Sequence, residues 1–169
     1  MTITNNPRVD AIRQSVRGSY DEINQLVEDH LTKMDSDILY QSPAPGEWTL
    51  MESLAHIVEF MPYWADEIVK LVAHPGQNFG RTKEDEARIR AIKEHDADSL
   101  DQAHIALSDS YGYLDRVLST LQDSDLELAG HHSKFGEKSL GWFIRDFVTD
   151  HLINHIEQMN ICLTALETK

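Results

Sequence analysis

Four long stretches of the chain carry apolar residues every three or four positions, and this spacing restricts the fold more than any other feature. The stretches cover residues 7–34, 48–73, 99–121 and 139–166. Residues three and four apart share one face of an α-helix, so each stretch predicts an amphipathic helix with one face against a core. No strand pattern is long enough to build a sheet, and no internal repeat is present. The sequence therefore predicts an all-α fold, a four-helix bundle formed by a single domain over residues 1–169.

The predicted helices begin at recognisable signals and are joined by connections of unequal length. Thr49 followed by Glu52, and Ser99 followed by Gln102, have the spacing of capping boxes. The first connection is a short loop containing Pro-Gly, which favours antiparallel neighbours for the first two helices. The passage before Ser99 is much longer, polar and charged, and forms at most a peripheral helix over residues 83–95. Its length allows the second and third helices to run parallel.

Charge and composition exclude several classes of partner. Acidic residues outnumber basic ones by 29 to 15, and the net charge of -14 repels a phosphate backbone, so we expect no nucleic-acid partner. No apolar run approaches the length of about 20 residues that spans a bilayer, so we expect no membrane partner. The first residues lack the basic and apolar regions of a signal peptide, and the single cysteine, Cys162, cannot form an intrachain disulfide. We therefore expect a cytoplasmic protein.

His151 and His155 lie one turn apart on the predicted last helix, on its apolar face. Two imidazoles at this spacing stand about 6 Å apart along the axis and can grip one metal ion if other elements supply further ligands. Burying both without partners would cost roughly 1 to 3 kcal/mol each. The pattern alone also fits two core histidines that form hydrogen bonds within the protein.

The other histidines are weaker candidates for a site. His56 falls at the border of the apolar arc of its helix, on the flank of Glu52 and Glu59, which suits either a ligand at the mouth of a cleft or a surface residue. His131 and His132 are adjacent in the chain, so their side chains point in different directions and make a poor pair of ligands. We expect four others at a helix end or in solvent: His30, His74, His95 and His104.

Two motifs together resemble the DinB superfamily of bacterial four-helix bundles. The second predicted helix opens with Trp48-Thr-Leu-Met-Glu-Ser-Leu-Ala-His56-Ile, and the last contains His151-Leu-Ile-Asn-His155-Ile-Glu-Gln158. In that family a tryptophan and a capping hydroxyl open the second helix, a histidine follows, and the last helix carries two histidines four residues apart. The resemblance covers nearly the whole chain. It implies an up-down-down-up topology, which agrees with the long second connection, and metal ligation by His56, His151 and His155.

The implied ligand set has consequences for chemistry. Three neutral imidazoles leave at least one coordination position open, as in catalytic sites, and a water there would have a pKa lowered towards neutrality. Zinc and nickel both suit imidazole, so the expected cofactor is a divalent transition metal of this kind. Side chains near the ligands could orient them, although Glu52 is equally explained as a capping partner alone. These candidate orienting residues are Glu52, Asp150, Asn154 and Gln158.

The family resemblance also implies a function. Relatives include metal-dependent enzymes that use low-molecular-weight thiols as transferases or isomerases, and others that resemble hydrolases. We therefore expect a metal-dependent enzyme of hydrolase or thiol-transferase type. Its substrate is expected to be a small molecule, and a low-molecular-weight thiol is one candidate. The alternatives are a bundle that binds metal without catalysis and an interaction bundle whose histidines are core residues.

We further expect a homodimer formed through an apolar helix face. Cys162 is expected to be buried; it lies roughly 10 Å along the helix from His155, which is too far to share its metal.

Overall fold

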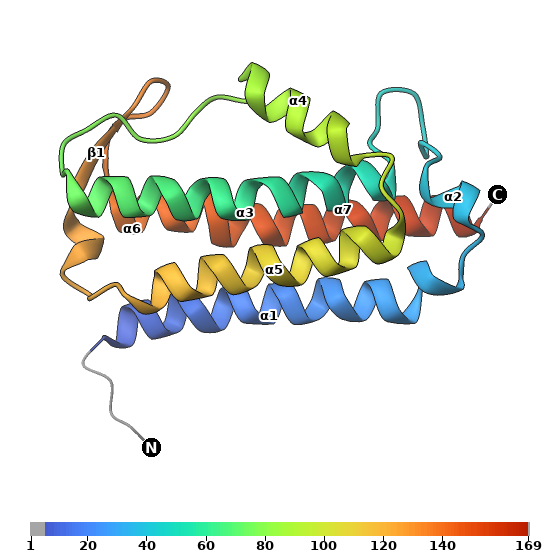
Figure 1. Cartoon of the computed structure of the whole chain (residues 1–169), viewed down its shortest axis with the longest axis horizontal. Helices are drawn as coiled ribbons and strands as arrows, with labels where there is room; N and C mark the ends of the chain where they lie inside the picture. Colours follow the sequence, from blue (N-terminus) through green and yellow to red (C-terminus); the bar gives the residue numbers. More distant parts are fainter. Residues whose placement is uncertain (1–5, 169) are drawn as a thin grey trace.

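The computed structural model describes residues 6–168 and confirms the predicted four-helix bundle (Figure 1). Three sides of the bundle are single helices, namely α1 (Pro7–Asp29), α3 (Leu50–Ala73) and α5 (Leu100–Ser119). The fourth side is a composite of α6 (Leu140–Ile144), the π-helical turn η3 (Arg145–Thr149) and α7 (Asp150–Glu167). Their apolar faces meet in one continuous core. Among the described helices, none has the length and apolar character needed to cross a bilayer.

The helices follow the up-down-down-up order that the family resemblance implies. In Figure 1, α1 and α7 run from left to right, whereas α3 and α5 run from right to left. Both α1 and α3 pack against α5 and α7, so α1 and α3 lie diagonally across the bundle. They are antiparallel as predicted, but the prediction that they are neighbours is wrong. The chain between them contains η1 (Leu31–Lys33) and α2 (Ser36–Leu39), which carry it across the bundle end.

The predicted helix starts of α3 and α5 are confirmed. Thr49 Oγ1 accepts from the Glu52 amide at 3.0 Å, and Glu52 Oε2 accepts from the Thr49 amide at 2.8 Å. Ser99 and Gln102 form the same reciprocal pair at the start of α5. Each box satisfies two backbone donors that a helix start leaves without partners, which fixes the residue at which the helix begins.

A proline inside α3 is accommodated by a side chain from α5. Pro62 has no amide hydrogen, so the carbonyl of Val58, four residues earlier, lacks its helical donor. The Ser110 hydroxyl donates to that carbonyl at 2.9 Å, and Ser110 is only 8% exposed. The break in the helical ladder therefore becomes a hydrogen bond between two helices of the bundle.

The connection between α3 and α5 packs against the bundle and contributes a residue to its core. The peripheral helix is present as α4 (Glu86–His95) and packs on α3, as expected. The polar composition of this connection does not predict a core residue in it, yet Phe79 is 2% exposed and stacks on Trp64 and Phe143. Gly80 has a φ of +77°, and a Cβ atom there would stand 2.7 Å from the Trp64 ring. Only glycine fits that position without displacing the ring.

Two further features differ from the predicted secondary structure. After η2 (Asp125–Glu127), the short strands β1 (Ala129–His132) and β2 (Gly136–Ser139) form an antiparallel hairpin that no strand pattern predicts. The Phe79 amide donates to the His131 carbonyl at 2.9 Å, which ties the hairpin to the connection. The predicted last helix is present and runs without a gap from Leu140 to Glu167, but it contains the π turn η3 immediately before α7.

Candidate metal centre

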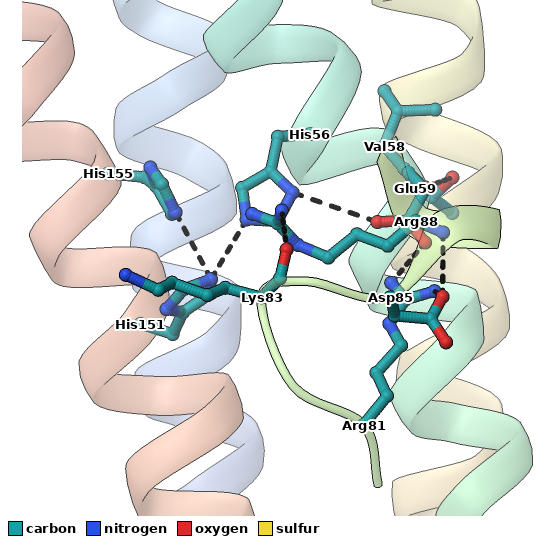
Figure 2. A network of polar contacts seen from close by, with 10 residues as sticks. His56, Val58, Glu59, Arg81, Lys83, Asp85, Arg88, His151 and His155 are labelled. Carbon is teal, nitrogen blue, oxygen red and sulfur yellow. Dashed lines mark hydrogen bonds and ion pairs between the residues drawn. The ribbon is translucent and has the colours of Figure 1, made fainter. Parts of the chain in front are cut away.

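Three histidine side chains from two helices meet inside the bundle. His56 Nε2 lies 3.0 Å from His151 Nε2, which in turn lies 3.1 Å from His155 Nε2. One ring nitrogen from each residue falls within 4.8 Å of the other two. Figure 2 shows the ring of His56, on α3, pointing towards the two rings on α7. The structure therefore brings together the three residues for which the family resemblance implies metal ligation.

The helices position these rings in a simple way. His151 and His155 occupy successive turns of α7, and His56 lies in the second turn of α3, which begins after the Thr49 cap. The surface alternative for His56 is wrong, because its side chain is only 2% exposed. His56 lies at the edge of the apolar face of α3. This edge is covered because α7 packs against α3. His155 is also buried and His151 is half-buried.

Aromatic side chains enclose the histidine cluster. The Trp48 ring stacks on His155 with a centroid distance of 5.9 Å and meets His56 edge-on at 5.2 Å. Phe60 meets His151 at 4.9 Å in a T-shaped contact. Aromatic contacts of this kind restrict ring orientation and displace water. Trp48 therefore has a physical role in the motif that carries the family resemblance.

Burial keeps the three histidines neutral at ordinary pH. Desolvation, followed by the neighbouring imidazoles, lowers the pKa of His151 to about 3. Desolvation and then His56 lower the pKa of His155 to about 4. The pKa of His56 is also lowered by burial, although the nearby Glu59 opposes this shift. A neutral imidazole offers a lone pair to a metal ion, so all three rings are in the state that ligation requires.

The protons available within the cluster cannot satisfy all of its contacts. Gln158 Oε1 accepts from His155 Nδ1 at 3.0 Å, so the proton of neutral His155 is on Nδ1 and its Nε2 carries a lone pair. His151 Nε2 faces both His155 Nε2 and His56 Nε2. One hydrogen at His151 Nε2 serves one neighbour, and a lone pair there leaves His155 without a donor. A cation between the rings would satisfy all three nitrogens together.

The distances also fit a metal ion. Bonds of about 2.0–2.1 Å at angles of about 90° to 109° separate two coordinated nitrogens by about 2.9–3.4 Å. The two contacts to His151 Nε2, at 3.0 and 3.1 Å, fall in this range. Imidazole nitrogens suit several divalent transition metals, zinc and nickel among them. The donor type and the two contacts to His151 therefore fit a divalent transition-metal ion.

Side chains that orient the rings are only partly those expected. Gln158 bonds to His155 as predicted, whereas Glu52 serves as the capping partner of Thr49. Asp150 and Asn154 are exposed and form no hydrogen bond with the cluster among residues 6–168. They line a cavity beside the cluster instead.

Glu59 lies beside His56 and is not among the orienting residues that the sequence predicts. Its Oε2 lies 3.7 Å from His56 Nδ1, and within residues 6–168 these two buried atoms have no hydrogen-bond partner. Its other carboxylate oxygen pairs with Arg81, which comes from the connection between α3 and α5. Burial alone would raise the pKa of Glu59, but the interactions with His56 and Arg81 hold it below its usual value. The carboxylate is therefore ionised beside the imidazole that would bind the metal. Its position one turn after His56 was a usable signal.

A cavity of about 590 Å³ opens beside the cluster. His56 and His151 form part of its lining, and aromatic rings form one wall, those of Phe60, Trp64, Phe135 and Phe147. Its basic side chains come from the connection and the hairpin, namely Arg81, Lys83, Arg88 and Lys134. A volume of this size accommodates a small organic molecule. The sequence offered no signal for these basic residues, since they belong to polar segments with weak periodicity.

The remaining histidines lie outside the cluster. His132 lines the cavity and is 2% exposed, but its nitrogens contact the Lys134 amide at 3.0 Å and the Arg81 carbonyl at 3.2 Å. His104 was expected in solvent, whereas it is half-buried and contacts Asn24 Oδ1 at 2.5 Å. Three are exposed as expected, namely His30, His74 and His95. Cys162 is buried, as predicted.

The fold is a four-helix bundle with three clustered histidines that could hold a metal ion, and comparison with known proteins identifies the family. Residues 19–159 match the DinB superfamily, and the chain belongs to it. None of the curated proteins matches the chain.

Two solved structures show the same fold. One is YfiT from Bacillus subtilis, described as a probable metal-dependent hydrolase with an unusual four-helix bundle topology; it is 15% identical, has a TM-score of 0.78, and the match covers 99% of this chain and 92% of that one. The other is a histidine-to-alanine variant of a mycothiol-dependent maleylpyruvate isomerase, which is 13% identical with a TM-score of 0.62. That match covers 94% of this chain but 60% of the isomerase.

Proposed function

We propose that this protein is a metal-dependent enzyme in which His56, His151 and His155 hold one divalent transition-metal ion. The observation that carries the proposal is the meeting of three neutral imidazoles, two buried and one half-buried, whose contacts no proton within the cluster can satisfy together. The adjoining cavity supports catalysis over a closed structural site, because His56 and His151 form part of its wall. A ligand in that cavity would have direct access to the ion.

We propose hydrolysis of a small molecule as the first candidate reaction, with transfer of a low-molecular-weight thiol as the second. A divalent ion supplies a Lewis-acid position and lowers the pKa of a water or thiol that occupies it. Gln158 holds a proton at Nδ1 of His155, which directs the Nε2 lone pair towards the other two rings. Trp48 and Phe60 pack against the rings and restrict their orientation. Likeness to YfiT supports the hydrolase reading, and likeness to the isomerase supports the thiol reading.

Elemental analysis of protein purified without a histidine tag tests the metal site. We expect close to one equivalent of a transition metal, zinc or nickel, and its loss in the His56→Ala and His155→Ala variants. His131→Ala is the matched control, because His131 is exposed on the hairpin and should leave the metal content unchanged. Wild-type protein with less than about a tenth of an equivalent, and with a melting temperature unchanged by added zinc or nickel, would refute the proposal.

Activity assays then separate the candidate reactions. Metal-loaded protein should hydrolyse small esters or amides, or should transfer a low-molecular-weight thiol to an electrophile, and the activity should disappear in His56→Ala. A protein that holds its metal, resists metal exchange and shows neither activity would support the alternative of a non-catalytic metal-binding bundle.

The predicted homodimer remains a proposal for the surface of α7. Ile153 and Ile161 expose 51% and 65% of their surface on this helix. Burying such side chains against a second copy would remove apolar area from water. Light scattering after size-exclusion chromatography should give twice the mass of one chain. The Ile161→Glu variant should have the mass of a single chain.

A further inference from the structure

Arg88 extends from α4 towards the histidine cluster, and within residues 6–168 no ion pair joins it to a carboxylate. Its Nη1 donates to the Lys83 carbonyl at 3.2 Å, and its guanidinium lies 5.9 Å from the centroid of the Trp48 ring. Figure 2 shows the side chain reaching towards His56 from the opposite side of the view to His151 and His155. The carbonyl and the ring hold the guanidinium in place, but neither neutralises its charge.

Arg81, the other arginine at the cavity, is in a different electrostatic state. It pairs with Glu59, lies 3.8 Å from Asp85 and packs over the Tyr63 ring. Three further carboxylates line the cavity, and no ion pair joins any of them to Arg88 within residues 6–168; they are Glu84, Asp146 and Asp150. Arg88 is therefore the cavity arginine with hydrogen-bond donors available to a ligand.

Arg88 lines the same cavity as two of the proposed metal ligands, His56 and His151. Three neutral imidazoles bring no negative charge to a bound divalent ion. The ion and Arg88 would then be two cations facing one cavity, whose lining carboxylates, Glu84, Asp146 and Asp150, form no ion pair with Arg88 within residues 6–168. An anion placed between them would remove this repulsion.

The chemistry of the cavity narrows the kind of anion. A guanidinium presents planar, parallel donors that match the two oxygens of a carboxylate. Trp64 and Phe147 stack with a centroid distance of 4.7 Å on the cavity wall, and Phe60 adds a third ring. These rings suit an aromatic or apolar body.

We propose that the cavity binds a small carboxylate with an aromatic or apolar body, and that Arg88 receives its carboxylate group. The proposal names the substrate class of the function proposed above and rests on it, since the bound ion supplies the second cation. Arg88 becomes the residue that selects anionic over neutral substrates.

Calorimetric titration of zinc-loaded protein with benzoate tests this inference, with benzamide as the neutral molecule of nearly the same shape. We expect benzoate to bind at least about tenfold more tightly than benzamide. Arg88→Gln should weaken benzoate binding about tenfold or more and leave benzamide binding and zinc content unchanged. Arg90→Gln is the matched control, because Arg90 is exposed on the same helix and its substitution removes the same charge. Benzoate binding should change less than about twofold in this variant.

The outcomes distinguish this inference from the proposed function. Zinc-loaded wild type that fails to bind benzoate, or Arg88→Gln that binds it as tightly as wild type, would overturn the role of Arg88 while the metal site stands. Equal binding of benzoate and benzamide would overturn it as well. If the protein binds no metal, the proposed function fails first. The same titration of metal-free protein then decides whether carboxylate binding still depends on Arg88, and an absence of that dependence would reject the inference too.

Discussion

Glu59 Oε2 lies 3.7 Å from His56 Nδ1, and each of these buried atoms lacks a hydrogen-bond partner among residues 6–168. A cation at His56 Nε2 would make the Nδ1 proton more acidic and strengthen its attraction to the carboxylate. We predict that Glu59→Gln lowers zinc affinity about 10- to 100-fold, as measured by competition with a chromophoric chelator. Asp66→Asn, an exposed carboxylate on the same helix, is the control and should have no effect. Equal affinities in the two variants would show that Glu59 only pairs with Arg81.

His132 provides a test of which histidines form the site. It is as buried as His56, but its two ring nitrogens already contact backbone atoms of Arg81 and Lys134. We predict that His132→Gln retains the full metal content, whereas His151→Gln loses it. Elemental analysis of both variants makes the comparison. Loss of metal from His132→Gln with unchanged folding by circular dichroism would require a different ligand set.

The bond between Ser110 and the Val58 carbonyl predicts a specific energetic coupling. Ser110→Ala should reduce the free energy of unfolding by about 1–3 kcal/mol, because it leaves a buried carbonyl without a donor. In a Pro62→Ala background the new amide hydrogen can serve Val58, so the same serine substitution should cost less. Urea unfolding of the four proteins of this double-mutant cycle measures the coupling. Purely additive effects would contradict this explanation.

The lowered pKa values predict how the stability of metal-free protein depends on pH. An unfolded histidine titrates near 6.5, whereas folded His151 and His155 titrate at about 3 and about 4. Below about pH 6.5 the unfolded chain therefore binds more protons, and stability decreases as the pH falls towards the folded values. Each histidine contributes up to about 1.4 kcal/mol per pH unit within this window.

Urea unfolding at about pH 7.5 and about pH 5 measures this dependence. Replacing both histidines by glutamine should remove their share of it, and the remaining slope reports the other titrating groups. A slope that is the same in wild type and in the double variant would show that these histidines are accessible to protons in the folded state.

Most of the helical framework could be predicted from the sequence, because its determinants are local. Apolar spacing identifies the four long helices, and Thr49 and Ser99 mark two of their starts through bonds to residues three positions away. The diagonal placement of α1 and α3 could not be predicted in this way, since it depends on how the intervening chain crosses the bundle end. The hairpin was missed because each of its strands has only four residues, too few for an alternating pattern.

The candidate site, too, could be predicted only where its determinants are local in the sequence. His151 and His155 were found because one helical turn separates them, and the family resemblance added His56. Arg81 and Arg88 were not found, since they reach the cluster from a polar connection whose position depends on Phe79 and Gly80. The burial of His56 likewise depends on which helix packs beside it. Neither relationship leaves a periodic signal in the sequence.

The π turn at Arg145–Thr149 places one extra residue within a helix. The two halves of this helix contact different parts of the protein. Phe143 and Ile144 before it belong to the hydrophobic core, while His151 and His155 after it face α3. Removing one residue from this turn would let an ordinary α-helix form, but would rotate everything beyond it by about 100° relative to the first half. Both histidines would then point away from His56. The extra residue thus sets the angle at which His151 and His155 leave the helix relative to the core residues before the turn.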